Sequence, residues 1–251
     1  PFHLEYFHET RPGVTHVRNR ALDIARGSDY LAFVDDDEFV TSEWLDILLQ
    51  QIQEESAAAI FGPVHPVYTK EAPKWLAKWG VHGTYIDSDG KQSKPGATCN
   101  CLIDMAVVEK EDMQFDPKMS LTGGEDTLFF SQLQDKGYAL AQSREAIVHE
   151  HIPDQRATVN WLLKRWYRTG ITDALIGGRN APALFTRAKA LLGGVARIGI
   201  GGLLAGLTGL VTLGQNPVAV MKRLYTVSRG AGMIAFAFGH QYEEYGRKKA
   251  S

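Results

Sequence analysis

The segment Tyr30–Phe39, with the sequence YLAFVDDDEF, decides how the rest of the chain is interpreted. Its apolar half has the length and the β-branched and aromatic content of a buried strand, and it stops abruptly at Asp35, Asp36 and Asp37. A helix is expected to start around Thr41, so the strand should end in a turn that carries the three aspartates. In open α/β sheets, ligands bind at that end of a strand.

Three carboxylates in one turn repel each other unless a positive charge lies among them. A divalent cation is the economical partner, since hard cations take oxygen ligands. A cation held in this way can grip a diphosphate and stabilise it as a leaving group. The alternative is a solvated acidic turn before a helix, whose N-terminus favours acidic residues. We take the cation site as the hypothesis and keep the solvated turn as its alternative.

The composition is that of an ordinary globular chain, with 44% hydrophobic and 22% charged residues among 251. A formal net charge of −2 gives no indication of nucleic-acid binding.

Cys99 and Cys101 are separated by one residue, a spacing that rarely forms a disulfide, so we expect reduced thiols and a cytoplasmic compartment. No signal peptide is found. Pro1 begins the sequence without a strand of its own, and we expect a fragment that lacks its N-terminal part.

Helices and strands alternate in the first part of the chain. Residues 14–26 have apolar positions at helical spacing, and Gly27 follows as a stop. Residues 42–52 are expected to form a second helix, capped at its start by Ser42. Residues 57–64, AAAIFGPV, have the pattern of another buried strand. This order of helix, strand, helix and strand is typical of a parallel α/β sheet.

Residues 65–95 differ from what precedes them, and we expect a long functional loop with a short helix at residues 74–78. Trp75 and Trp79 lie in this segment. Aromatic side chains in such loops either stack on sugars and other ligands or anchor the loop to its domain, and the sequence leaves both interpretations open.

Two later motifs carry side chains that can do chemistry. Glu125 and Asp126 follow two glycines at the expected start of a helix over residues 127–136. They are either acids favoured by the helix dipole or a general base that faces a cleft. His149 and His151 alternate onto one face of an extended segment, where they are metal or phosphate ligands or structural histidines.

The last third of the chain is basic and rich in glycine. A helix expected over residues 156–168 carries arginines that either reach a diphosphate or form a basic face. Residues 198–213 are uncharged and apolar but shorter than a membrane span requires. A second apolar patch covers residues 233–238, and basic residues surround it: Lys222, Arg223, Arg229, Arg247, Lys248 and Lys249. We expect a helical tail, residues 179–251, at an anionic membrane surface, the alternative being a hairpin packed on the domain.

In this order, the segments RNRALDIARGSDYLAFVDDDEF, GPV, GGEDTLF, HEHIP and RATVNWLLKRWYRTG resemble a family 2 glycosyltransferase of the GT-A fold. The subgroup is the bacterial exopolysaccharide, or succinoglycan-synthesis, type. The resemblance implies an α/β domain, residues 1–178, with a GT-A, Rossmann-like mixed sheet, flanking helices and its first strands missing. The helical, membrane-associated tail would follow it.

The resemblance also implies roles for particular residues. Arg18 and Asn19 would lie beside the nucleotide, and the D-x-D site would fall on the aspartate turn, with Asp37 as the direct ligand of Mn²⁺ or Mg²⁺. Asp126 would be the general base. With the histidines and the tryptophan described above, the candidate site comprises catalytic Asp126 and Glu125; cofactor-binding Arg18, Asn19, Asp35 and Asp36; metal-binding Asp35, Asp37, His149 and His151; and acceptor-side Trp75, Arg165 and Trp166.

The implied activity is transfer of a sugar, with inversion, from a nucleotide-sugar donor to a saccharide or lipid-linked saccharide. Its place would be bacterial polysaccharide synthesis at the cytoplasmic face of the inner membrane, with a peripheral or re-entrant tail. The glutamine that begins the acceptor-side motif of processive relatives is not in place before Arg165, so we do not expect a processive polymerase. Two alternatives stay open: a metal-dependent phosphoryl or nucleotidyl transferase, which would also use an aspartate cluster, and a non-catalytic membrane-associated module.

Overall fold

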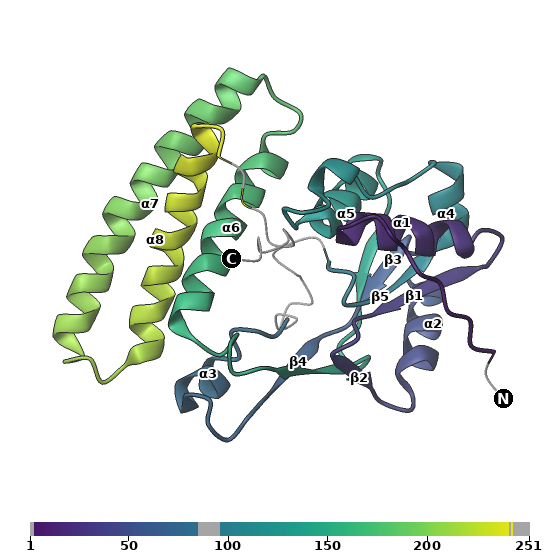
Figure 1. Cartoon of the computed structure of the whole chain (residues 1–251), viewed down its shortest axis with the longest axis horizontal. Coiled ribbons are helices and arrows are strands. Elements are labelled where there is room, and N and C mark those ends of the chain that lie inside the picture. Colours follow the sequence, from purple (N-terminus) through teal and green to yellow (C-terminus); the bar gives the residue numbers. More distant parts are fainter. Residues whose placement is uncertain (1–2, 85–95, 241, 243–251) are drawn as a thin grey trace.

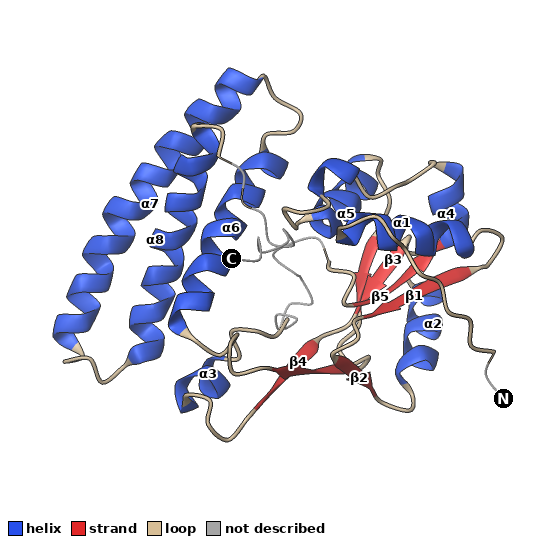
Figure 2. Cartoon of the chain, viewed as in Figure 1, coloured by secondary structure: helices blue, strands red, loops and turns tan. Residues whose placement is uncertain are grey.

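The computed structural model describes residues 3–84, 96–240 and 242, which form two small sheets flanked by helices (Figures 1 and 2). The strands are β1 (Tyr30–Val34), β2 (Glu38–Val40), β3 (Ala59–Phe61), β4 (Val64–Tyr68), β5 (Asn100–Asp104), β6 (Leu140–Gln142) and β7 (Val148–Ile152). The larger sheet has the order β1-β5-β3-β6 and the smaller one the order β2-β7-β4. The predicted mixed α/β architecture is confirmed.

Helices flank the two sheets. They are α1 (Val14–Ile24), α2 (Trp44–Glu54), α3 (Lys74–Trp79), α4 (Met105–Lys110), the 3-10 helix η1 (Pro117–Met119), α5 (Glu125–Asp135), α6 (Val159–Gly177), α7 (Ala183–Val211) and α8 (Pro217–Ala237). Figure 1 shows α1, α4 and α5 over one face of the larger sheet and α2 over the other. The last part of the loop predicted over residues 65–95, from residue 85 on, lies outside the described residues.

Two hydrophobic cores lie on the two faces of the larger sheet because side chains alternate along a strand. On β5, Cys101 and Ile103 enter the core under α1, α4 and α5, whereas Leu102 enters the core under α2. Phe61 of β3 packs edge-on against Phe130 of α5, with ring centroids 4.6 Å apart. Cys99 and Cys101 are free thiols, as predicted. The packing of α5 on β3 fixes the place of the helix that begins with Glu125.

The alternation of helices and strands predicts a parallel sheet, and this is wrong for β5. That strand runs antiparallel to both β1 and β3, whereas β3 and β6 are parallel. The chain reaches β5 through the long segment after α3, not through one crossover helix, so the right-handed βαβ rule does not set its direction.

The two short strands β2 and β4 of the smaller sheet are absent from the sequence prediction. The aspartate turn leads into β2, not directly into a helix, and α2 begins only at Trp44. Residues 65–68, predicted as loop, belong to β4 (Val64–Tyr68). Both strands pair with β7, which lies about eighty or more positions further along the chain, so no local pattern reveals them.

The helices α6, α7 and α8 form a bundle beside the sheets, in which α8 packs against both α6 and α7 (Figure 1). The bundle therefore contains residues on both sides of position 178, the predicted domain boundary. A cluster that includes Leu76, Ile152, Leu162 and Met221 joins it to α3 and β7. This contact places the start of α6 next to the smaller sheet.

The prediction that the apolar stretch of residues 198–213 is too short for a membrane span is corrected by the structure. The helix α7 extends back to Ala183 and has 29 residues. Arg197 lies inside this helix, and its Nη1 donates a hydrogen bond at 3.1 Å to the carbonyl oxygen of Gly193, one turn earlier. Among the described residues, α7 is the one helix long and apolar enough to cross a membrane, judged by length and composition.

Candidate functional site

The aspartate turn lies where the two sheets meet, between the end of β1 and the start of β2. Glu38 closes it: Oε2 accepts a hydrogen bond from the backbone N–H of Asp35 at 2.8 Å. The backbone N–H of Glu38 in turn donates to the carbonyl oxygen of Asp35 at 3.2 Å. The backbone N–H of His151 on β7 donates to the carbonyl oxygen of Asp37 at 3.1 Å. The turn is therefore fixed to both sheets.

The pKa of Asp35 is raised, and its causes show what surrounds this carboxyl. Partial loss of water is the largest cause, although the residue keeps contact with solvent. Arg18 acts in the opposite direction, whereas Asp37, Asp126 and Asp36 raise the pKa further by repulsion. Residues from α1, the turn itself and α5 thus act on one carboxyl, so the structure brings these distant parts of the sequence together.

Two glutamates extend the acidic site onto the smaller sheet. Glu38 and Glu150 are directly opposite in the pairing of β2 with β7, so their side chains share a face. Burial raises the pKa of Glu38 to about 8, with Asp35, Glu150 and Asp37 adding to the effect. Burial also raises the pKa of Glu150, and Asp37 adds to it. A bound cation would relieve this repulsion.

Arg156 supplies a positive charge at the edge of this acidic face. Its Nη1 donates to Asp37 Oδ2 at 3.2 Å and to Glu150 Oε1 at 3.3 Å. The carbonyl oxygen of Arg156 accepts a hydrogen bond from His82 Nε2 at 3.0 Å, so that nitrogen carries the proton. His82 Nδ1 then accepts from the hydroxyl of Tyr68 at 2.9 Å. The buried imidazole fixes the backbone that carries Arg156.

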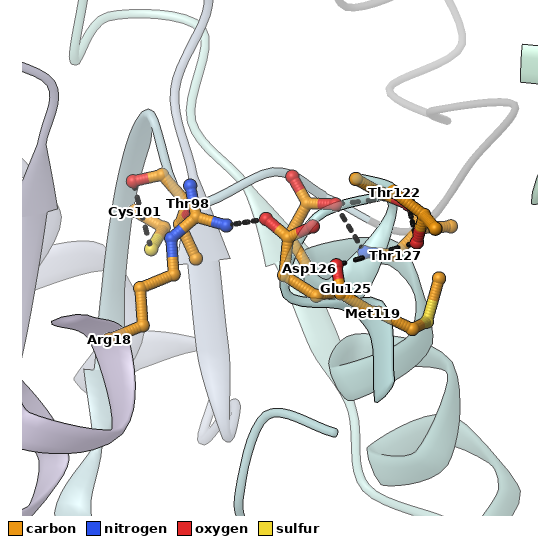
Figure 3. A network of polar contacts seen from close by, with 9 residues as sticks. Arg18, Thr98, Cys101, Met119, Thr122, Glu125, Asp126 and Thr127 are labelled. Atoms are coloured by element: carbon orange, nitrogen blue, oxygen red, sulfur yellow. Dashed lines mark hydrogen bonds and ion pairs between the residues drawn. The ribbon is translucent and has the colours of Figure 1, made fainter. Parts of the chain in front are cut away.

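The start of α5 carries the predicted catalytic pair. Arg18 of α1 forms an ion pair with Glu125, and the two side chains are only 12% and 4% exposed (Figure 3). Burial and repulsion from Asp126 raise the pKa of Glu125, which Arg18 opposes. Asp126 is instead bonded locally: its Oδ1 accepts from the backbone N–H of Thr127 at 2.6 Å and from the Thr127 hydroxyl at 3.3 Å. Glu125 therefore fastens α1 to α5, and Asp126 lies at the helix start.

Two glycines allow this helix start to approach α6. Gly123 and Gly124 have φ angles of 75° and 89°, which L side chains rarely adopt. A Cβ on Gly123 would lie 2.6 Å from Arg168 Nη1, and one on Gly124 would lie 2.4 Å from Thr172 Cγ2. Both positions thus require glycine, and Arg168 lies next to the turn that presents Glu125 and Asp126.

Asn19 has a structural contact that the sequence does not reveal. Its Nδ2 donates to the carbonyl oxygen of Phe115 at 2.9 Å, and its Oδ1 accepts from the backbone N–H of the same residue at 2.8 Å. Both ends of the amide therefore join α1 to the segment before η1. Of the two residues predicted to lie beside the nucleotide, only Arg18 acts on the aspartate turn.

The two predicted histidine ligands face away from the carboxylates. His149 and His151 lie on the face of β7 opposite to Glu150, because side chains alternate along a strand. Both pack against Phe39, with ring centroids 5.1 Å and 5.2 Å apart. The same alternation that groups the histidines also separates Glu150 from them. That signal was present in the sequence, whereas the pairing of Glu38 with Glu150 was not.

The predicted acceptor-side residues separate in the structure. Trp166 is buried in the core and packs against Trp79, with centroids 5.6 Å apart, so its predicted contact with an acceptor is corrected to a packing role. Trp75 is half-buried in the same cluster, as the anchoring interpretation requires. Arg165 lies over the ring of Trp161 at 5.1 Å and acts electrostatically on Glu150. Of the three, Arg165 is the one whose charge acts on the acidic face.

The donor atoms in the turn fit a divalent cation that is shared with a ligand. Within the described part of the chain, no three histidine, cysteine, aspartate or glutamate side chains converge as a ready-made metal site. Asp35 and Asp37 nevertheless offer hard oxygen donors from one turn. Mg²⁺ is often held by one or two carboxylates, with water and substrate phosphates as the remaining ligands. The turn suits that arrangement better than a cage made of protein alone.

The chain is similar to one family model, to a bacterial relative and, more distantly, to solved structures. A family model described as Glycosyl transferase family 2 matches residues 1–113. The succinoglycan biosynthesis protein ExoM of Rhizobium meliloti (strain 1021) is 33% identical over 252 residues, which cover 100% of this chain and 79% of that protein. Among solved structures, S. aureus TarS 1–349 with UDP-GlcNAc matches at a TM-score of 0.42 and 14% identity, covering 97% of this chain and 80% of the other. The same protein with UDP gives 0.38 and 12%, covering 93% and 76%.

Proposed function

The chain belongs to glycosyltransferase family 2, and we propose that it transfers a sugar from a nucleotide-sugar donor to a saccharide acceptor, with inversion, in bacterial exopolysaccharide synthesis. One observation carries the proposal: Arg18, the aspartate turn and Asp126 converge on a single acidic site. That convergence supplies a place for a diphosphate and a place for a base within one site, as group transfer between two substrates requires.

The donor half of the proposal assigns the diphosphate to the aspartate turn. Asp35 and Asp37 would hold Mn²⁺ or Mg²⁺, and Asp36 lies at the exposed tip of the same turn. When bound, the cation stabilises the negative charge of the departing nucleoside diphosphate. Arg18 adds positive charge beside Asp35 and orients the donor from the side of α1. Arg156 and Arg165 add charge from the side of the smaller sheet.

The acceptor half assigns the general base to Asp126. Its Oδ1 accepts both hydrogen bonds from Thr127, so we assign Oδ2 to the acceptor hydroxyl. Oδ2 takes the hydroxyl proton while the acceptor oxygen forms a bond to the anomeric carbon. The bond from that carbon to the diphosphate breaks, and its electron pair leaves with the nucleoside diphosphate. Attack from the face opposite to the leaving group inverts the anomeric centre.

The tail supports a proposal about where the enzyme acts. We assign the enzyme to the cytoplasmic face of the inner membrane, with a lipid-linked saccharide as acceptor. Support comes from α7, whose exposed side chains are largely apolar, and from the basic residues of the α7–α8 hairpin. Contact with an anionic membrane surface would bring the enzyme and such an acceptor into the same layer.

A donor screen tests the proposal. The protein is incubated with Mn²⁺ and each of a panel of nucleotide-sugars, with and without a lipid-linked oligosaccharide extract, and the released nucleotide is identified by chromatography. We expect release of a nucleoside diphosphate from one donor, accelerated by the extract, and transfer of the labelled sugar to it. Release of pyrophosphate or inorganic phosphate would instead indicate a nucleotidyl or phosphoryl transferase, and no release from any donor would contradict catalysis.

A further inference from the structure

The helix α7 presents a continuous apolar face to solvent, which we call the outer stripe. Its members are 49% to 73% exposed: Leu192, Val195, Ile200, Leu203, Leu207 and Leu210. Between Leu192 and Leu213 the sequence has Arg197 as its one charged residue, and this guanidinium bonds back to Gly193. Contiguous exposed apolar surface of this kind marks a site of contact with a partner or a membrane.

The opposite face of α7 is fixed against α8 by close backbone contact. A Cβ added to Gly194 would lie 2.7 Å from the carbonyl oxygen of Gly230, and one added to Gly201 would lie 3.1 Å from Val227 Cγ2. The two helices can approach this closely because glycine stands at the contact points. The outer stripe is therefore the face of α7 that points away from the bundle. Figure 1 shows that α7 lies at the outer edge of that bundle.

In turn, α8 is fixed against α6 by glycine contacts and polar bonds. A Cβ on Gly232 would lie 1.9 Å from the carbonyl oxygen of Tyr167. The hydroxyl of Ser228 donates to the carbonyl oxygen of Leu163 at 2.6 Å, and Arg229 forms an ion pair with Asp173. The three helices are thus held as one unit that includes ionised side chains.

This arrangement decides how α7 can meet a bilayer. If α7 crossed the membrane, the helices fixed to it would follow, and the pair of Asp173 and Arg229 would enter the hydrocarbon with Lys222 and Arg223. Burying such charges in a bilayer is costly, and a structure that places them there needs a functional reason. If α7 lies flat, only the outer stripe enters the lipid, and the charges on α6 and α8 stay on the aqueous side.

The charge of the hairpin selects the kind of surface. Between Asp173 and Glu243 the sequence has no acidic residue, but it has seven basic ones: Arg179, Arg187, Lys189, Arg197, Lys222, Arg223 and Arg229. Arg187 and Lys189 are exposed near the start of α7, and Lys222 and Arg223 are exposed near the start of α8. The exposed basic residues lie at both ends of the outer stripe, so they suit an anionic lipid surface.

We propose that α7 lies in the plane of an anionic bilayer, with the outer stripe in the lipid and α8 and α6 stacked above it in water. The proposal rests on the membrane contact proposed above and replaces a peripheral or re-entrant tail by one defined orientation. It does not depend on glycosyl transfer, which a soluble acceptor assayed without vesicles tests separately.

Depth measurements along the stripe test this orientation. Leu192→Cys, Leu203→Cys and Leu210→Cys are each labelled with an environment-sensitive fluorophore and mixed with phosphatidylglycerol–phosphatidylcholine vesicles that contain shallow or deep doxyl quenchers. The matched control is Leu45→Cys, because Leu45 is 43% exposed on α2, away from the tail. The unsubstituted protein is the labelling blank, since Cys101 is buried and Cys99 half-buried.

We expect all three stripe labels to be quenched alike by the shallow quencher, and the Leu45→Cys label by neither. Strong quenching of the Leu203→Cys label by the deep quencher, with weak quenching at Leu192→Cys and Leu210→Cys, would show a crossing helix and overturn the proposal. Absence of quenching at all three positions would overturn it too, and would show that the α7–α8 hairpin does not insert into the bilayer.

A second arm tests the role of charge. Replacing Lys222 and Arg223 together by glutamine should weaken binding to the anionic vesicles by roughly tenfold or more, since each cation near such a surface contributes about a fivefold factor. Binding to vesicles of phosphatidylcholine alone should not change. Equal affinity of the double variant and the wild type for anionic vesicles would overturn the assignment of an anionic surface.

Discussion

Arg156 donates a hydrogen bond to Asp37, with Nη1 3.2 Å from Oδ2. In this state a side chain of the protein already supplies positive charge to the carboxylate assigned to the cation. A metal ion that binds Asp37 must therefore compete with Arg156. We predict that Arg156→Gln raises the affinity for Mn²⁺ in the absence of nucleotide, by about tenfold, the usual scale for losing a nearby competing charge. Electron paramagnetic resonance titration of free Mn²⁺ measures this.

The control separates competition at Asp37 from a general effect of charge. Arg165 acts on Glu150 through space, so Arg165→Gln removes the same charge from the same neighbourhood. If both variants gain equal affinity for Mn²⁺, the loss of positive charge near the site explains the result, and direct competition between Arg156 and the metal ion at Asp37 is ruled out. Arg179→Gln, which loses an ion pair with Asp135, should leave Mn²⁺ binding unchanged.

Replacing Asp37 should remove metal-dependent binding without unfolding the protein. The carboxylate lies in a turn and is 35% exposed, so Asp37→Ala loses a partly exposed ion pair with Arg156 but also relieves repulsion from the neighbouring acids, while it removes a cation ligand. Calorimetric titration of a nucleoside diphosphate with Mn²⁺ should show no binding, and thermal unfolding should be near that of the wild type. Asp46→Ala on α2 is the control. Unchanged metal affinity in both Asp37→Ala and Asp35→Ala would contradict the assignment.

Substitution of Asp126 should affect turnover, whereas substitution of its neighbour Glu125 should affect stability. Asp126→Asn should lower turnover by about 10²-fold or more, the scale of a lost general base, while donor affinity and stability persist. Glu125→Gln should instead lower the free energy of unfolding by about 3 kcal/mol, because it removes the charged member of a buried ion pair with Arg18. Steady-state kinetics and urea unfolding measure the two losses. Near-normal turnover of Asp126→Asn would move the base to another residue.

The buried imidazole of His82 should make stability depend on pH. Burial lowers its pKa from 6.5 to about 4, so between these values the unfolded chain binds a proton that the folded chain does not. Stability from this group is therefore complete above pH 6.5 and is lost as the pH falls toward 4, by about 3 kcal/mol at most.

The measurement is urea unfolding at pH 7 and pH 4.5 for the wild type and for His82→Gln. The variant should be less stable at pH 7, because Tyr68 and the carbonyl of Arg156 lose a partner, but it should lose less stability on acidification. Carboxylates contribute their own pH dependence to both proteins, so the difference between the two is the quantity to compare. Equal losses in both would exclude His82 as the source.

Much of the fold follows from local pattern. Apolar spacing predicts α1, and the length and composition of the apolar run predict β1. The glycine pair followed by acids predicts a helix over residues 127–136, and α5 begins two residues earlier, at Glu125. These elements carry the donor-side arginine, the aspartate turn and the proposed base. These elements can be predicted locally because each packs against or within the larger sheet, and the spacing of its apolar residues follows the buried side.

The remainder depends on pairings that no local pattern encodes. The smaller sheet consists of short strands with mixed composition, and it exists because β7 returns between β2 and β4. Glu150 and Arg156 join the site only through that return. The motif assigns Trp166 to the acceptor side, but an aromatic residue in a helix is equally suited to a core. Only the positions of α3 and α8 show that Trp166 is a core residue.

The aspartate turn also acts as a mechanical joint. Asp35 continues from β1 of the larger sheet, whereas the carbonyl oxygen of Asp37 is bonded to β7 of the smaller one. The separation of the two carboxylates thus depends on the angle between the sheets. A cation that binds both carboxylates would link the two sheets and restrict changes in the angle between them. By reciprocity, a ligand or contact that tilts the smaller sheet would change the affinity of the turn for the cation. The bound cation would oppose that tilt by the same coupling free energy.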